Sequence, residues 1–157
     1  MDENKEFMSE ALKIAESNMH NLTGGPFGAL IVKDGNIIAK AVNTVTKVND
    51  PTAHAEINAI RLAAENLRTF NLSGCVLYTS CEPCPMCLAA VYWARIDKIY
   101  FSGSRLDARN AGFDDSFIYD EFDRPVKYRR VKIEQLLPKE GKNVLAQWVT
   151  IPDKIDY

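Results

Sequence analysis

The chain has 157 residues, of which 46% are hydrophobic and 25% are charged, and its formal net charge at pH 7 is −2. This length suits one domain with a buried core, and the composition excludes a disordered or fibrous protein. The small negative charge excludes an overall basic field that would gather phosphates, so a nucleic-acid substrate would need a local basic patch.

The sequence also indicates the compartment. No apolar run approaches the ~18 residues of a membrane span, and residues 1–5 lack the apolar region of a secretory signal. Three of the four cysteines fall within seven residues, which is typical of metal binding rather than of a disulfide framework. The four are Cys75, Cys81, Cys84 and Cys87. We therefore expect a cytoplasmic protein with no membrane partner.

The first part of the chain predicts a helix and a β-hairpin. Apolar residues between positions 7 and 19 recur at three- and four-residue steps, as on one face of a helix, and Gly24-Gly25-Pro26 ends it. Two apolar runs follow, at residues 27–32 and 37–42. Asp34-Gly35 between them is a strong hairpin signal.

The middle of the chain predicts alternating helices and strands. Helix-start residues at 50–52 precede an apolar stripe over residues 59–67. Residues 75–78 predict a buried strand, Pro85 opens a further helix, and residues 98–101 predict another strand. The side chains expected to pack inward from the Pro85 helix are Leu88, Val91 and Tyr92. A strand, helix and strand at this spacing form a βαβ unit with parallel strands.

These elements predict an α/β fold, a three-layer α/β/α sandwich with a central mixed sheet, as one domain over residues 1–157. Residues 107–123, acidic and aromatic together, predict a functional loop with short helical turns. Residues 126–137 are compatible with a strand or a helix, and residues 142–149 predict a terminal helix that carries Trp148.

The strongest signal is His54-Ala55-Glu56 followed by Pro83-Cys84-Pro85-Met86-Cys87. A CxxC at a helix start brings two thiolates together, and the helix N-terminus favours their negative charge. With His54 as a nitrogen ligand, three protein ligands suit Zn²⁺ and leave a fourth tetrahedral position for water. Zinc lowers the pKa of that water from ~16 toward ~7, and Glu56 is the carboxylate expected to carry protons.

Other interpretations remain open at this point. Cys84 and Cys87 could form a thioredoxin-like redox pair, although His54 and Glu56 would then be unexplained. Cys81 could join the three ligands in a closed Cys₃His zinc site, which would make the chain a structural zinc module without hydrolysis. Cys75 is interpreted as a plain buried thiol.

The H-x-E and P-C-x-x-C pair resembles the signature of the zinc deaminases, the cytidine deaminase superfamily. Residues 24–29, 49–56 and 78–87 resemble its purine-acting members, the bacterial guanine deaminases and the adenosine deaminases of tRNA. Similarity to the bacterial guanine deaminases in particular lies in residues 92–95 and 111–119 and in the terminal Tyr157. It spans nearly the whole chain, and residues 126–150 are the least distinctive.

The resemblance implies hydrolysis of guanine, a small purine base, to xanthine and ammonia. His54, Cys84 and Cys87 would bind the zinc. Glu56 would protonate the ring nitrogen, and Asp115 would shuttle a proton to the leaving amine. Two carboxylates are reasonable because the two nitrogens need protons at different places and times.

The resemblance also implies a substrate pocket and a dimer. The residues expected to line the pocket are Asn43, Phe27, Ala55, Trp93 and Tyr157. Members of this family form homodimers that exchange C-terminal segments, here about residues 126–157, so Tyr157 could close the site of a partner. Pro152 interrupts any helix running to the end, which leaves the delivery of Tyr157 open.

Other substrates stay open as alternatives, namely guanosine, cytosine, and triazine or pterin amines. Transfer RNA is a further one, because five basic residues lie within residues 124–132. Asp153 and Asp156 would repel a phosphate backbone, and the net charge is negative, so nucleic acid is not expected as a partner.

Overall fold

The computed structural model describes residues 2–157, and the chain divides into two compact units. The first unit ends at Asp115 and holds the whole sheet, while the second comprises Ser116–Tyr157. None of the helices in residues 2–157 is long and apolar enough to cross a membrane.

The opening helix, α1 (Glu3–His20), begins where Asp2 accepts a 3.1 Å hydrogen bond from the backbone N–H of Asn4. Its buried residues are Ala11, Ala15 and Asn18, which lie on one face at helical spacing. Two of these three are alanines, so the helix lies close to the sheet, and the third is a polar residue that needs partners there.

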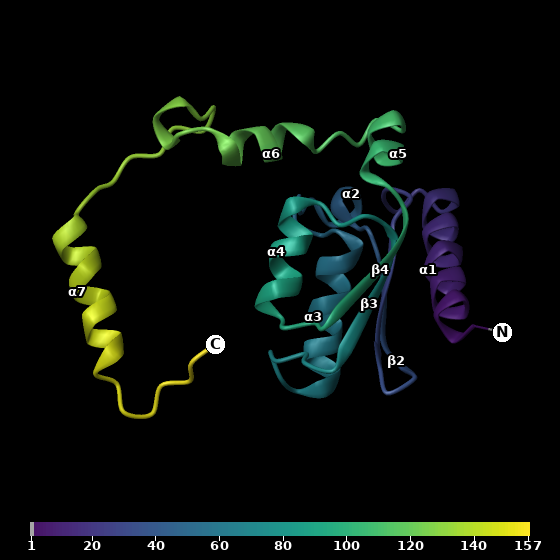
Figure 1. The fold of residues 1–157 in the computed structure, drawn as a ribbon, viewed down its shortest axis with the longest axis horizontal. Helices are drawn as coiled ribbons and strands as arrows, with labels where there is room; N and C mark the ends of the chain where they lie inside the picture. The colour runs from purple at the N-terminus through teal and green to yellow at the C-terminus, as the bar shows by residue number, and fades with distance from the viewer. Residues whose placement is uncertain (1) are drawn as a thin grey trace. The chain divides into compact units, whose positions relative to one another are not determined.

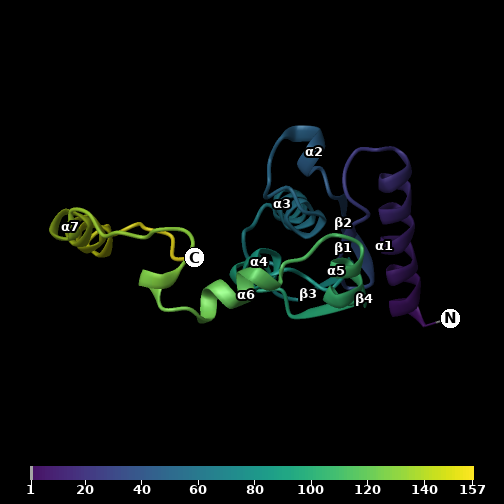
Figure 2. The ribbon, with the colours of Figure 1, turned by 90° about the horizontal axis from the view of Figure 1, so that it is seen from above.

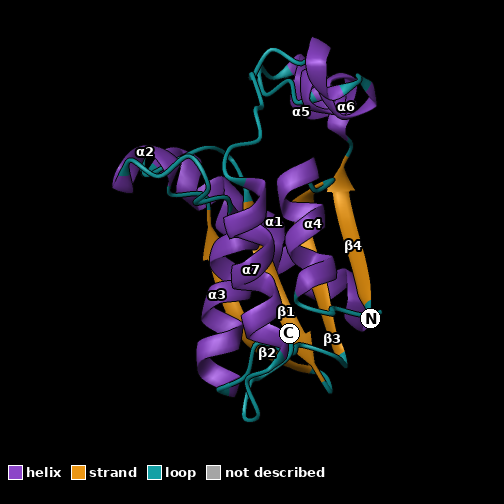
Figure 3. Cartoon of the chain, turned by 90° about the vertical axis from the view of Figure 1, so that its left-hand side faces the viewer, coloured by secondary structure: helices purple, strands orange, loops and turns teal. Residues whose placement is uncertain are grey.

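The sheet has four strands in the order β2-β1-β3-β4 (Figure 3). They are β1 (Gly28–Lys33), β2 (Asn36–Val42), β3 (Cys75–Cys81) and β4 (Lys98–Gly103). Strand β1 is antiparallel to both β2 and β3, and β3 is parallel to β4, which confirms the mixed sheet. Asp34 and Gly35 both have positive φ, as a type I′ hairpin turn requires.

Helices cover both faces of this sheet. Helix α1 lies on one face, and α3 (Ala55–Leu67) and α4 (Pro85–Trp93) lie on the other (Figures 1 and 2). Two short helices, α2 (Val45–Val48) and α5 (Arg105–Asn110), flank the strands. The three-layer α/β/α prediction is therefore confirmed.

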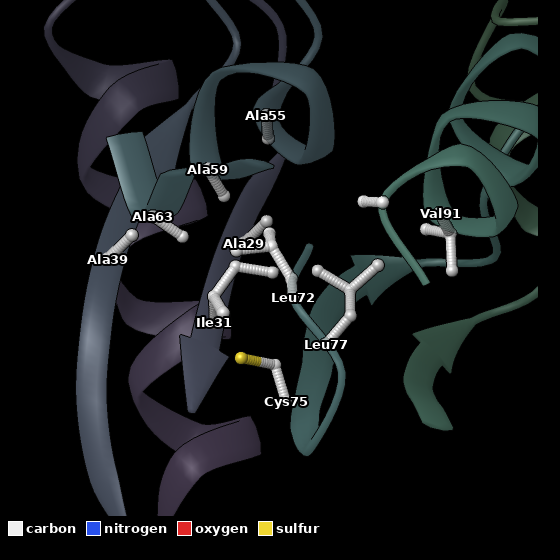
Figure 4. Close-up of a cluster of buried hydrophobic side chains, with 11 residues drawn as sticks. Ala29, Ile31, Ala39, Ala55, Ala59, Ala63, Leu72, Cys75, Leu77 and Val91 are labelled. Atoms are coloured by element: carbon white, nitrogen blue, oxygen red, sulfur yellow. The ribbon is translucent and has the colours of Figure 1, made fainter. Parts of the chain in front are cut away.

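The core lies between the sheet and helix α3 (Figure 4). Ala55, Ala59 and Ala63 recur every four residues along α3 and are buried against the sheet. Their small side chains let the helix approach the larger Ile31 and Leu77 of β1 and β3. This close packing fixes the N-terminal end of α3.

Two expectations for this unit are wrong. Helix α3 begins at Ala55 rather than at residues 50–52, because Asp50 accepts hydrogen bonds from the N–H and hydroxyl of Thr52 at 2.8 and 2.7 Å and forms a turn instead. Tyr92 is 75% exposed rather than packed inward, since it lies about 100° around the helix from the buried Val91.

The second unit contains α6 (Ser116–Asp123), the 3₁₀ turn η1 (Val126–Tyr128) and α7 (Pro138–Val149). The terminal helix is confirmed and begins earlier than predicted, with Pro138 in its first turn. Residues 126–137, predicted as a strand or a helix, form only η1 and irregular backbone. None of residues 116–157 is buried, so this unit has no core of its own.

Candidate metal centre

The candidate ligands stand where two helices begin. His54 is the N-cap of α3, with an extended backbone at φ −68° and ψ 156°. Cys84 is the N-cap of α4, Pro85 opens that helix, and Cys87 lies in its first turn. As a non-helical N-cap, His54 can face the same space as Glu56, although residues two apart within a helix point in nearly opposite directions.

Three ligand atoms converge on one point. The Nδ1 atom of His54 lies 3.6 Å from Sγ of Cys84 and 3.5 Å from Sγ of Cys87. The ligand atoms of all three residues lie within 4.8 Å of one another. Zinc–nitrogen and zinc–sulfur bonds in a tetrahedral site separate N from S by about 3.6 Å, so this donor set fits Zn²⁺.

The electrostatics of the cluster favour a cation. The pKa of Cys84 is lowered to about 4, because its sulfur accepts a hydrogen bond from Cys87 and interacts with His54. The pKa of Cys87 is raised, since its proton is held by the Cys84 sulfur and its side chain is buried. One thiolate is therefore present at neutral pH at the N-terminus of α4, where anions are favoured.

Glu56 lies against this cluster. Its side chain is buried, with Oε1 3.2 Å from Oγ1 of Thr79 and Oε2 3.5 Å from Sγ of Cys87. Burial raises the pKa of the Glu56 carboxyl above its ordinary range. A carboxyl that holds its proton more tightly than usual can act as a general acid as well as a general base.

Cys81 stands apart from the three ligands. Its sulfur donates a 3.7 Å hydrogen bond to the carbonyl of Ser104, and burial raises the pKa of its thiol to about 11. Within residues 2–157, the metal-binding group consists of His54, Cys84 and Cys87 without Cys81. The donor arrangement is that of an open three-ligand site rather than a closed Cys₃His site.

Asn43 follows β2 with its side-chain amide in a defined orientation. Oδ1 accepts hydrogen bonds from the backbone N–H groups of Gly25, at 3.3 Å, and Val45, at 3.2 Å. Of the two amide atoms, only the oxygen can accept hydrogen bonds from N–H groups. These two contacts therefore assign which side of the amide is Oδ1 and which is Nδ2. Nδ2, on the opposite side of the amide, is therefore the atom that carries its two N–H donors.

An aromatic pair lies next to Asn43. Phe27 and Phe113 meet edge to face, with ring centroids 4.9 Å apart. The backbone N–H of Asn43 donates to the carbonyl of Phe27 at 3.1 Å, so the pair and the amide occupy one neighbourhood. Burial raises the pKa of Asp115, two residues beyond Phe113, and repulsion from Cys84 raises it further. Asp115 is thus within electrostatic reach of the metal ligands.

Strand register explains why these residues meet. The start of β1 lies beside the ends of β2 and β3, and the end of β4 lies beside the end of β3. The paired residues are Gly28 with Val42, Ala29 with Thr79, and Cys81 with Gly103. A 3.0 Å hydrogen bond from the backbone N–H of Gly28 to Oγ of Ser80 joins β1 to β3 at the same end.

The other predicted pocket residues have different positions. Ala55 is fully buried in the core, so a ligand can meet only its backbone, whose N–H is the first of the N-terminal donors of α3. Trp93 ends α4 and is 67% exposed, and Tyr157 belongs to the second unit. Roles for Trp93 and Tyr157 stay predictions.

Sequence reasoning did not select Phe113, Thr79, Asn58 or Asn18 as site residues. Asn18 carried a detectable signal, because it falls on the same helical face as Ala11 and Ala15, where a polar residue must find buried partners. Thr79 and Phe113 lie in segments that carry the family resemblance but were given no role, and no sequence pattern marked Asn58.

Comparison with known proteins agrees with this geometry. Residues 1–103 match the family described as the cytidine and deoxycytidylate deaminase zinc-binding region. The guanine deaminase of Bacillus subtilis strain 168 is 48% identical over 151 residues, which cover 96% of this chain and 97% of that protein. An X-ray structure of guanine deaminase from Bacillus subtilis superposes with a TM-score of 0.95 at 47% identity over 98% of each chain. A tRNA-specific adenosine deaminase of Aquifex aeolicus is 42% identical over 123 residues, 78% of this chain and 79% of that protein.

Proposed function

We propose that this chain hydrolyses guanine to xanthine and ammonia. The premise is that it belongs to the zinc-dependent cytidine and deoxycytidylate deaminase family and to its guanine deaminase branch. The observation that carries the proposal is the buried carboxyl of Glu56, which contacts the sulfur of a zinc ligand beside an open three-ligand site. In the reaction, the bond from C2 of guanine to its amino nitrogen breaks. Water supplies the oxygen that C2 gains, one hydrogen that ends on the neighbouring ring nitrogen, and one hydrogen that leaves with the amine as ammonia.

The two carboxyl groups divide the proton transfers. When bound, zinc supplies a water molecule acidic enough to act as a nucleophile at neutral pH. Glu56 carries a proton to the ring nitrogen next to C2, for which its raised pKa is suited. Asp115, also with a raised pKa, delivers a proton to the departing amine. Because the two groups belong to different elements, each can serve a different nitrogen.

The remaining residues hold the purine. Nδ2 of Asn43 donates a hydrogen bond to an acceptor on the base, and the ring of Phe27 forms an aromatic wall held edge to face by Phe113. The backbone N–H of Ala55 donates from the start of α3. Trp93 adds a second aromatic wall, and Tyr157 closes the pocket.

The arginines of the basic segment favour a small substrate over tRNA. Arg124 pairs with Glu121 at 2.9 Å, and Nε of Arg130 lies 3.8 Å from the same carboxylate. Arg129 donates to the backbone carbonyls of Arg124 and Phe122 at 3.2 Å each. These side chains organise the second unit itself and leave fewer groups to bind phosphates.

The active protein is proposed to be a homodimer in which about residues 126–157 pack on the partner. The C-terminal unit buries none of its own residues, yet α7 carries exposed apolar side chains. These are Val144, Leu145, Trp148 and Val149. An apolar helix without a core needs a surface to cover it. Light scattering should give the molar mass of a dimer for the whole chain and that of a monomer after removal of residues 126–157. A monomeric mass for the whole chain would contradict this arrangement.

One experiment tests the substrate directly. Purified protein is incubated with guanine, guanosine, adenine, cytosine and tRNA, and ammonia release is measured. We expect release from guanine far above the others, and none from Cys84→Ser, which removes a zinc ligand. Release from tRNA alone, or from none of these compounds, would overturn the proposal.

A further inference from the structure

We propose that Asn18, on helix α1, is a positioning residue that holds the Asn43 amide in its substrate-binding orientation, an inference that rests on the function proposed above. Asn18 is only 3% exposed and stands among the alanines of the buried face of α1. A polar side chain at such a position is retained where it makes specific hydrogen bonds.

Asn18 joins the two segments that orient the Asn43 amide. Its Nδ2 atom donates to the carbonyl of Gly25 at 2.8 Å and to the carbonyl of Asn43 at 2.9 Å. Its Oδ1 atom accepts a hydrogen bond from the hydroxyl of Thr23. One side chain therefore ties residues 23–25 to the backbone of Asn43, and all three of its contacts are local to this junction.

This tie determines the direction of the Asn43 amide. The N–H of Gly25 is one of the two donors that hold Oδ1 of Asn43, and the other comes from Val45. If Gly25 moved away, Val45 alone would hold Oδ1, and the amide, with its Nδ2 donors, would be oriented less precisely.

A second asparagine supports the same segment from the other face of the sheet. Asn58, on α3, donates from Nδ2 to the carbonyl of Val42 at 2.9 Å and to Oγ1 of Thr44 at 3.0 Å. Asn58 therefore fixes the backbone on both sides of Asn43, on the side of the Val45 donor. Asn18 is the residue that holds the other donor, Gly25, in place.

The test is a double-mutant cycle, because a residue that acts through Asn43 has no effect once that amide is gone. We expect Asn18→Ala to lower kcat/KM for guanine by up to about 100-fold, the effect of misplacing a substrate-positioning group by about 1 Å. In an Asn43→Ala background the same change should lower kcat/KM by less than about threefold. Additive losses, or wild-type kcat/KM in Asn18→Ala, would overturn the inference.

Asn66→Ala is the matched control. Asn66, on α3, donates from Nδ2 to the carbonyl of Ile38 in β2 at 2.8 Å, an amide-to-carbonyl bond of the same length at an exposed position away from the site. It should change the unfolding midpoint in urea without changing kcat/KM. Asn18→Asp keeps the acceptor for Thr23 but loses the donors, and it replaces Asn18→Ala in the cycle should that variant not fold.

Different results would reject the proposed substrate, guanine, and the proposed positioning role of Asn18. No ammonia from guanine with wild-type protein rejects the proposed substrate, and the cycle is then run on whichever compound of the panel is deaminated. Normal turnover by Asn43→Ala removes the amide from substrate binding and rejects the role of Asn18 with it. Turnover with additive losses rejects the positioning role alone.

Discussion

Replacing Gly24 with alanine is expected to disable the enzyme while leaving its zinc in place. A Cβ atom at this position would lie 2.0 Å from the backbone oxygen of Asn43 and 2.9 Å from its Oδ1. Real Cβ contacts essentially never fall below 3.0 Å, so Asn43 or the loop must move by about 1 Å. A displacement of this size at a substrate-positioning group can reduce catalysis about 100-fold.

Steady-state kinetics with guanine and metal analysis of the same preparation measure this effect. Gly24→Ala should lose about 100-fold in kcat/KM and retain zinc, because the ligands lie on α3 and α4 rather than on this loop. Gly141→Ala is the control for adding a methyl group without a clash, since nothing within the same chain lies within 4 Å of its added Cβ. In a helix interior alanine is favoured over glycine by up to ~1 kcal/mol, so this variant should be as active as wild type and no less stable. Kinetics within twofold of wild type for Gly24→Ala would refute the steric argument.

Four further substitutions probe the cluster and the scaffold. Glu56→Gln should keep zinc and lose about 10²- to 10⁴-fold in turnover, the usual contribution of general acid–base catalysis; unchanged turnover would exclude its proton-carrying role. After dialysis, Cys84→Ser should lack zinc and Cys81→Ser should retain it, and metal loss from the latter would indicate a closed site. Glu10→Gln removes an exposed 2.6 Å ion pair with Lys40 and should cost about 0.2–1 kcal/mol in urea unfolding at pH 7. The Lys40 hydrogen bond lowers the pKa of Glu10, so this difference should be full above pH 4.5 and vanish as pH falls through the lowered pKa; a difference independent of pH would contradict the assignment.

The regular elements of the first unit were predictable because each has a strong local signal. Asp34-Gly35 indicated the hairpin, and both residues adopt the positive φ that such a turn needs. The start of α3 was not predictable to the residue, because Asp50 and Thr52 suit a helix start and a side-chain-capped turn equally well. Residues 126–137 carry mixed patterns, and their structure depends on contacts of Arg129 and Glu121 that no periodicity shows.

The metal site was more predictable than the pocket around it. Cys84 and Cys87 lie one helical turn apart, so their convergence follows from local geometry, and the motif with His54 and Glu56 supplied the rest. The orientation of the Asn43 amide could not be foreseen, because its backbone is held by Asn18, 25 residues away in the chain. Such contacts depend on how α1 packs on the sheet, which the sequence pattern of either segment leaves open.

The antiparallel placement of β1 is what completes the site. In the β3–α4–β4 unit, parallel strands direct their carboxyl ends, and hence Cys84 and the segment leading to Asp115, to one end of the sheet. Because β1 runs opposite to β3, the residue that precedes it, Phe27, lies at this same end, and the hairpin returns β2 so that Asn43 follows there too. Had β1 been parallel to β3, Phe27 would stand about one strand length away, roughly 20 Å for six residues. The antiparallel order thus brings Phe27 and Asn43 to the same end of the sheet as the candidate metal ligands, which a purely parallel sheet would not do with these connections.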